Sequence, residues 1–400
     1  MKPYILILCA NLKGNIGDYA ILEAMGVNLA NLYIDHEIKY LYHGHKGIDP
    51  LRIEPFTKEL IKPLENAGAP PFYRRPKWFR LLQKSPISKI TIQNLHSKLI
   101  DKTAARMLKN PEFNQILTGA SSVYFAGGAQ WGRGDLHLNM FAQLTAAKSL
   151  GCHTYAFPFS LTEQTINCVG EQKFVPLIQK LESPMPVRDA LSFNILDTHG
   201  IKALSTCDIV WSMANHLKVS PKVQPSESNK ICVCVTRSGG GKAEEVAQVI
   251  GHIQAAGFEP IVLSTCEIED ADMIKEIEQL SNIKCIAPNS WKQAVDILAE
   301  TRFVITNRLH CIIFSSLAGT AVIPISNRAK TKAFVRDANL PCYATNISDI
   351  GPNEIREFDA QSPLIIDRIL AFKKKCQNDI SELLPKITHS LDSWKCPLSR

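Results

Sequence analysis

An arginine and a histidine lie two positions apart at the end of an apolar run, in residues 304–310, which read VITNRLH. The run is typical of a buried strand, and the mostly apolar residues 311–318 that follow predict a helix. Arg308 and His310 would then lie at the carboxyl end of a strand and at the positive end of a helix. A guanidinium there suits an anion, and an imidazole can supply a proton near neutral pH. This is the strongest chemical signal in the sequence.

A second polar loop follows the apolar run 4–10, where residues 14–18 read GNIGD. Its glycines permit tight backbone turns, and Asp18 stands at the opening of a predicted helix. An aspartate that caps a helix is common, so a purely structural interpretation stands beside a functional one. In the functional interpretation, Asp18 accepts the proton of a substrate hydroxyl.

A third loop, residues 127–135, reads GGAQWGRGD and follows a predicted strand at 122–126. Gly127 and Gly128 would let backbone amides approach a ligand closely. The order of a dinucleotide fingerprint, GxGxxG, is absent after this strand. Trp131 either offers a face to a sugar ring or packs against the protein.

Two further basic positions follow predicted strands. Arg188 lies in residues 187–192, VRDALS, where it either grips a carboxylate or phosphate or pairs with Asp189 at a helix start. Residues 326–332, SNRAKTK, form a basic loop that either contacts phosphate or is a solvated face. The residues alone do not decide either case. A phosphate loop at 238–242, SGGGK, is disfavoured because Ala243 follows the lysine and the upstream glycine is missing.

These loops require a scaffold of alternating strands and helices. Strands are predicted at 4–10, 122–126, 153–157, 231–236, 259–264, 301–306 and 321–325, with helices between them. The fold class is therefore α/β, with two doubly wound, Rossmann-like domains facing a cleft. We expect an N-terminal domain at 1–217, a C-terminal domain at 230–365 and a C-terminal helix at 366–400 that packs back on the first domain. A proline-rich insertion or lid is expected at about 55–115.

Composition limits the partners. The chain has 400 residues, a formal charge of +7 and 21% charged residues, which favours anionic ligands without any motif for nucleic acid. Its 12 cysteines are scattered through apolar runs, which is typical of reduced thiols, and no spacing indicates a metal site. The first apolar run is too short for a bilayer or a signal peptide, so a cytoplasmic location is expected.

Taken in order, GNIGD, the Gly127-Gly128 loop, Arg188 with Ser192, and Arg308-Leu309-His310 resemble the motifs of the polysaccharide pyruvyl transferase family. The resemblance spans roughly residues 4–342 outside the insertion and implies a GT-B-like fold. The second loop departs from the longer glycine run of the family, and residues 157–159 replace a glycine-containing turn. These departures leave the acceptor sugar open.

The resemblance implies that phosphoenolpyruvate donates a pyruvate ketal to two hydroxyls of a sugar in cell-surface polysaccharide biosynthesis. His310 would be the general acid and Asp18 the base. No cofactor or metal is implied. The substrate-binding residues would be Arg188, Arg308, Asn15, Gly17, Gly127, Gly128, Gln130, Trp131, Ser192, Arg328 and Lys330.

Two alternatives share this architecture. One is a GT-B glycosyltransferase with a nucleotide-sugar donor, and the other is a noncatalytic glycan-binding protein. A lipid-linked acceptor, peripheral contact with the inner face of the membrane, and homo-oligomerisation are left open by the sequence.

Overall fold

The computed structural model describes residues 3–12, 14–44, 88–128, 137–217, 227–237, 240–326, 328–341 and 344–388. The chain divides into two compact units. Unit 1 comprises the described residues of Met1–Leu12, Ile21–Ile209 and Asp379–Arg400, and unit 2 those of Lys13–Ala20 and Val210–Asn378. We expected the boundary between 217 and 230, whereas the structure places it at Ile209–Val210 and assigns residues 14–20 to unit 2.

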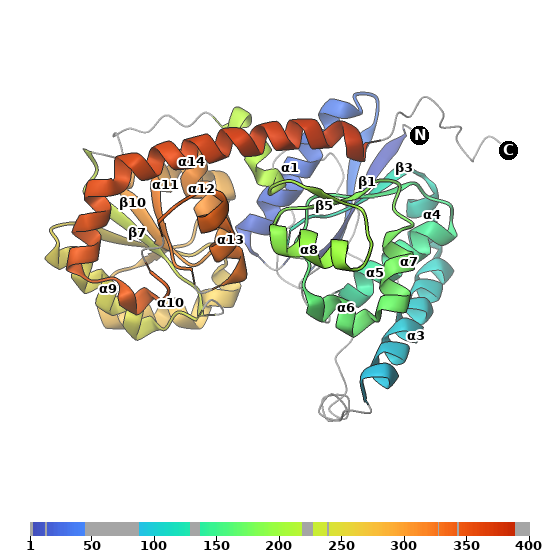
Figure 1. Cartoon of the computed structure of the whole chain (residues 1–400), viewed down its shortest axis with the longest axis horizontal. Coiled ribbons are helices and arrows are strands. Elements are labelled where there is room, and N and C mark those ends of the chain that lie inside the picture. Colours follow the sequence, from blue (N-terminus) through green and yellow to red (C-terminus); the bar gives the residue numbers. More distant parts are fainter. Residues whose placement is uncertain are drawn as a thin grey trace. The chain divides into compact units, whose positions relative to one another are not determined.

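Unit 1 is built on parallel strands (Figure 1). Four of them pair in the order β2-β1-β3-β4, with β1 (Tyr4–Leu12), β2 (Glu37–Gly44), β3 (Ala120–Phe125) and β4 (Thr154–Ala156). The strands β5 (Met185–Val187) and β6 (Ala203–Ser205) form a second parallel pair. Phe159 bridges the two sheets because it pairs with both Gly128 and Val187.

The helices of unit 1 are α1 (Ile16–Leu32), which begins in unit 2, α3 (Ser88–Lys109), α4 (Pro111–Thr118), α5 (His137–Ser149), α6 (Glu163–Val169), α7 (Glu171–Ile178) and α8 (Ala190–Thr198). In β1, the side chains of Ile5, Leu6, Ile7 and Leu8 are fully buried. Burial on both faces is the reason that this strand reads as a continuous apolar run.

Residues 88–118 differ from the expected insertion. They form α3 and α4, and Ile100, Met107 and Phe113 are fully buried in the unit 1 core. The apolar residues of this segment recur at helical spacing and form a buried face, whereas the proline-rich residues lie before it in the chain. Residues 55–87 of the expected insertion lie outside the described residues.

Unit 2 contains a five-stranded parallel sheet in the order β11-β10-β7-β8-β9. Its strands are β7 (Lys230–Cys234), β8 (Glu259–Leu263), β9 (Cys285–Ile286), β10 (Phe303–Thr306) and β11 (Ala321–Pro324). The short β9 was not predicted. The centre of the sheet is dry, since Cys232, Val233 and Cys234 of β7 and all of β10 are buried.

The helices of unit 2 are α9 (Ala243–Ala255), α10 (Glu267–Ser281), α11 (Trp291–Ala299), α12 (Leu309–Ala318), α13 (Ala329–Asp337) and most of α14 (Pro352–Ile387), with two 3-10 helices, η3 (Ile209–His216) and η6 (Ile347–Asp349). Helices α9 and α10 contact each other, as do α11 and α12. Figure 1 shows these two pairs on opposite sides of the strands. This is the arrangement that right-handed crossovers produce when the strand order reverses at β7.

The final helix begins earlier than expected. α14 starts at Pro352, and its last residues, from Asp379, belong to unit 1. Proline is favoured in the first turn of a helix, where its missing N–H costs nothing. Among the described residues, none of the helices combines the length and the apolarity that a bilayer crossing requires.

Candidate functional site

The carboxyl end of β10 positions the arginine and the histidine. Arg308 has extended backbone angles and is the N-cap of α12, so His310 lies in the first helical turn. Asn307 fixes this junction, because its side chain accepts from Thr236 N (3.0 Å) and donates to Thr236 O (3.1 Å). The Arg308 amide donates to Thr306 Oγ1 (3.0 Å). The predicted placement of both residues at a strand end and a helix start is confirmed.

Arg308 is a buried cation, and one of its N–H groups is an unsatisfied hydrogen-bond donor. The residue is 9% exposed, and its Nη2 donates to Asp270 Oδ2 (2.5 Å). Its Nε atom is buried and has no hydrogen-bond partner. Burial lowers the pKa of Arg308, but the nearby charge of Asp270 raises it further, so the pKa ends above its usual value. The guanidinium is therefore charged, and one of its N–H groups is unsatisfied, which is costly without a ligand.

Asp270 was not singled out from the sequence. It lies in the first turn of α10, is 3% exposed, and accepts from Thr236 Oγ1 and Ser264 Oγ, both at 3.0 Å. Thr236 follows β7, Ser264 follows β8 and Arg308 follows β10, so the carboxyl ends of three strands meet at this carboxylate. The sequence did contain one signal for this site: polar residues directly follow three of the apolar runs that form strands.

The GNIGD loop lies in unit 2, on the connection between β8 and α10. Ile16 N donates to Thr265 O (3.0 Å), and Asn15 forms a bridge with Cys266. Asn15 Oδ1 accepts from Gly17 N (3.0 Å), as an N-capping side chain does. Asn15 was expected to bind substrate, and the structure gives its side-chain oxygen this capping contact. Asp18 therefore lies inside the first turn of α1 and is not its cap.

Gly17 lies directly against His310. A β-carbon at Gly17 would lie 2.1 Å from His310 Nδ1, a distance that no real contact reaches. Glycine is thus the residue that allows the imidazole to lie on α1. The His310 ring also stacks on Phe314, one turn along α12, with centroids 6.3 Å apart. The histidine is half-buried and its ring is held from two sides.

In unit 1, Arg188 follows β5 and is tied to neighbouring strand ends. Its Nε donates to Ser160 Oγ (2.8 Å) and its Nη1 donates to Asp208 Oδ2. The side chain of Arg188 is 3% exposed and that of Asp208 is 5% exposed. The partner of Arg188 is therefore Asp208, which follows β6, and not the adjacent Asp189 that the structural interpretation had offered.

Asp189 and Ser192 form the start of α8. Asp189 caps this helix, since its Oδ1 accepts from Ser192 N (2.8 Å) and from the Ser192 hydroxyl (2.8 Å). The Ser192 hydroxyl accepts from Leu161 N (2.7 Å), and the residue is fully buried. The Ser192 hydroxyl thus joins a helix start to a neighbouring loop, and its expected substrate contact stays a prediction.

The glycines after β3 serve packing. A β-carbon at Gly127 would lie 2.3 Å from Pro158 O, so this residue permits close backbone approach. The Gly128 amide donates to Pro158 O (2.9 Å), and a substrate contact of Gly128 stays a prediction. Gln130 and Trp131, also expected to bind substrate, lie outside the described residues.

The basic residues after β11 begin a helix. Arg328 is the N-cap of α13 and Lys330 lies in its first turn, so the expected loop at 326–332 is helical from residue 329. Both side chains are half-buried. Their role as phosphate contacts stays a prediction, as do the substrate roles of Arg188, Gly17 and Gly127.

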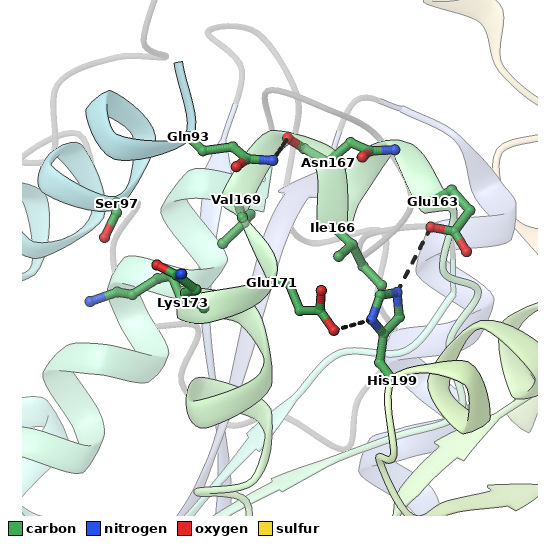
Figure 2. A pocket seen from close by; sticks show the side chains of 11 residues that line it. Gln93, Ser97, Glu163, Ile166, Asn167, Val169, Glu171, Lys173 and His199 are labelled. Carbon is green, nitrogen blue, oxygen red and sulfur yellow. Dashed lines mark hydrogen bonds and ion pairs between the residues drawn. The ribbon is translucent and has the colours of Figure 1, made fainter. Parts of the chain in front are cut away.

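A cavity of about 540 Å³ lies elsewhere in unit 1 (Figure 2). His199 joins two helix starts there, because its Nδ1 lies 2.7 Å from Glu171 and its Nε2 lies 3.9 Å from Glu163. The cavity contains none of the predicted site residues. In the described part of the chain, no three histidine, cysteine or acidic side chains gather as a metal site requires.

The sequence of the chain matches the model of one known protein family. The family model described as polysaccharide pyruvyl transferase matches residues 15–328. The chain belongs to this family. The matched range begins at Asn15, includes His310 and ends at Arg328. No curated protein sequence matches the chain.

Solved structures confirm the fold class of the chain. UDP-GlcNAc 2-epimerase from Neisseria meningitidis, bound to UDP-GlcNAc, is similar with a TM-score of 0.62 and 13% identity, over 96% of this chain and 100% of the other. A putative UDP-N-acetylglucosamine 2-epimerase from Listeria monocytogenes has a TM-score of 0.61 and 10% identity, over 99% of both chains. Os79 from O. sativa, in complex with UDP, has a TM-score of 0.51 and 10% identity, over 96% and 100%. At these identities the similarity establishes the GT-B-like α/β fold alone.

Proposed function

We propose that this protein transfers the pyruvate unit of phosphoenolpyruvate to two hydroxyls of a sugar, forming a cyclic ketal in cell-surface polysaccharide biosynthesis. Membership of the pyruvyl transferase family supports the transferred group. The observation that carries the proposal is the buried Arg308, whose Nε lacks a partner, two residues before His310 at the start of α12.

An anionic donor suits this position for two reasons. The first amides of an α-helix have no intrahelical acceptor, and the helix dipole favours negative charge at the same end. Arg308 adds a permanent positive charge and the unsatisfied Nε–H. A phosphate or carboxylate oxygen would satisfy that donor, and a charged hydrogen bond in a buried position is strong. No cofactor enters this proposal, since phosphoenolpyruvate is itself the activated donor.

His310 would be the general acid. Protonation of the methylene carbon of phosphoenolpyruvate makes the neighbouring carbon electrophilic, and a sugar hydroxyl attacks it while losing its proton. Departure of inorganic phosphate regenerates an electrophilic centre, which the second hydroxyl closes to the ketal with loss of a second proton. The fixed position of the ring between Gly17 and Phe314 supports this role, because a proton donor must be oriented.

Asp18 would accept a hydroxyl proton. It follows Gly17, the residue against which the imidazole of His310 lies, and it is partly exposed in the first turn of α1. A carboxylate near the acid can act as the base of the same reaction. Both arginines pair with a buried carboxylate, but Nε of Arg188 donates to Ser160 whereas Nε of Arg308 has no hydrogen-bond partner. We therefore base the anion site on Arg308, and a donor contact of Arg188 stays a secondary part of the proposal.

The test is donor binding followed by turnover. Titration calorimetry of the purified full chain should show binding of phosphoenolpyruvate, with UDP-GlcNAc as the comparison ligand. Incubation with phosphoenolpyruvate and a panel of free and lipid-linked glycans should release inorganic phosphate and add a pyruvate-sized mass to one glycan. Binding of UDP-GlcNAc in place of phosphoenolpyruvate would overturn the proposal in favour of nucleotide-sugar chemistry.

A further inference from the structure

Arg308, the cation of the proposed anion site, already forms an ion pair with a carboxylate of the protein. Arg308 Nη2 and Asp270 Oδ2 are 2.5 Å apart, and the side chains are 9% and 4% exposed. The pair is neutral as a whole, so Arg308 does not present a full unpaired charge to a ligand. Attraction between two such groups is strong where water is excluded.

The side chain of Asp270 is fixed by hydrogen bonds from two hydroxyl groups in addition to its contact with Arg308. Thr236 donates to Oδ1 of Asp270 and Ser264 donates to Oδ2, each at 3.0 Å. Thr236 is itself fixed by Asn307, which exchanges two hydrogen bonds with its backbone. With both carboxylate oxygens occupied, Asp270 is an anchor that determines the direction of the Arg308 guanidinium.

A bound anion would meet two opposing effects. The Arg308 Nε–H attracts it, and the Asp270 carboxylate, which contacts the same guanidinium, repels it. We propose that Asp270 is a positioning residue that orients Arg308 and, by sharing its charge, weakens anion binding enough for product phosphate to leave. This inference rests on the proposed function for the identity of the product, but anion affinity itself can be measured without turnover.

The direction in which anion affinity changes when Asp270 is replaced distinguishes this role from a purely structural one. Asp270→Asn keeps the shape and an oxygen that can accept from Arg308, but removes the negative charge. Anion affinity should then rise, on the order of tenfold, because one unit of repulsion within several ångströms of the ligand disappears. A residue that only supports the fold would leave anion affinity unchanged or lower it when replaced.

The first experiment measures the dissociation constant of inorganic phosphate by calorimetry in the wild type, Asp270→Asn and Asp272→Asn. Asp272 is an exposed residue two positions along α10, so its variant carries the same change of charge without contact to Arg308. We expect a roughly tenfold lower constant for Asp270→Asn alone. In the double variant Asp270→Asn/Arg308→Ala, the gain in phosphate affinity should disappear. Equal or weaker phosphate binding by Asp270→Asn, or no binding by either protein, would overturn the inference.

The loss of a buried ion-pair partner could prevent Asp270→Asn from folding. Ser264→Ala and Thr236→Val then decide, because each removes one hydrogen bond that holds Asp270 and leaves the pair in place. Asp270 keeps its full negative charge in both variants but loses part of its anchoring, so both should bind phosphate more weakly than the wild type by a few-fold. Unchanged or tighter phosphate binding in both variants would refute the anchoring.

Turnover separates this inference from the proposed function. In Asp270→Asn, the KM for phosphoenolpyruvate and the inhibition constant of phosphate should fall together, and kcat should fall because product leaves more slowly. If phosphate binding responds as expected but phosphoenolpyruvate is never consumed, the proposed function fails and the role of Asp270 stands. If phosphoenolpyruvate is consumed with unaltered KM and unaltered phosphate inhibition, the role of Asp270 fails and the proposed function stands.

Discussion

The imidazole of His310 lies against Gly17, so closely that a β-carbon at Gly17 would overlap Nδ1 at 2.1 Å. The two residues belong to different helices, α12 and α1, at opposite ends of the matched family range. Their contact brings the Asn15–Asp18 loop and the Arg308–His310 segment into one region of unit 2. This contact, and not their order in the chain, places the two segments side by side.

Replacing Gly17 with alanine should move the imidazole. The added methyl group would overlap the His310 ring, whereas Gly17 itself has no left-handed backbone angle that alanine would strain. We expect phosphate release to fall by at least about tenfold, since misplacing a catalytic group by about an ångström costs about that much or more. Steady-state kinetics would measure it.

The matched control is Gly251→Ala in α9, where a β-carbon would meet nothing within 4 Å. That variant should keep full activity and gain about 0.5–1 kcal/mol of stability from helix propensity. Full activity of Gly17→Ala would show that His310 does not depend on this contact.

Replacing His310 with alanine should remove the proton donor. Phosphate release should fall about 10²- to 10⁴-fold, which is the usual contribution of a general acid, while the far-UV spectrum stays that of the wild type. His153, whose side chain is 42% exposed in unit 1, supplies a control variant that should leave turnover unchanged. A His310→Ala protein with wild-type turnover would remove this residue from the mechanism.

Replacing Arg188 with alanine should destabilise unit 1. The change removes the cation that pairs with the buried carboxylate of Asp208, and breaking a buried ion pair in this way typically costs about 3–5 kcal/mol. Chemical denaturation would measure the loss. Arg237, an exposed arginine paired with Glu276, is the control, and its alanine variant should unfold at the same denaturant concentration as the wild type. Equal stability of Arg188→Ala and Arg237→Ala would contradict the importance of the buried pair.

Alkaline pH should destabilise unit 1. Burial raises the pKa of Tyr4 to about 12 and that of Cys152 to about 11. Each group stays protonated in the folded state at a pH where the unfolded chain has already lost the proton. Their contribution is therefore complete below the unfolded pKa of 9.0 for the thiol and 10.0 for the phenol, and is lost as the pH rises through the folded values.

Urea denaturation at pH 7.5, 9, 10 and 10.5 would measure this dependence. The free energy of unfolding should fall by up to about 1.4 kcal/mol per pH unit for each such group. Cys152→Ala should show a shallower fall above pH 9 than the wild type. An identical slope in this variant would show that the Cys152 thiol does not contribute.

Local patterns accounted for much of the scaffold. The apolar runs at 4–10, 231–236 and 301–306 became β1, β7 and β10, because a strand buried on both faces needs apolar side chains at every position. The strand β9, only Cys285–Ile286, left no such pattern because two residues are too few for a period. Residues 88–109 were misread as part of an insertion, although their helical period places Ile100 and Met107 in the core.

The sequence by itself determined the residue types and the chain order of the candidate site: Asp18 in a glycine loop, and Arg308 and His310 after a buried strand. These are local features, since a strand, a turn and a helix start are each specified by a few neighbouring residues. Only the tertiary structure decided the partners: Asp270 on Arg308, Asp208 on Arg188, and Gly17 under His310. In the sequence, Asp270 is one of several acidic residues of α10 and does not differ from the exposed Asp272. Its burial and its hydrogen bonds arise because parallel strands bring their carboxyl ends together, whatever the distance between them along the chain.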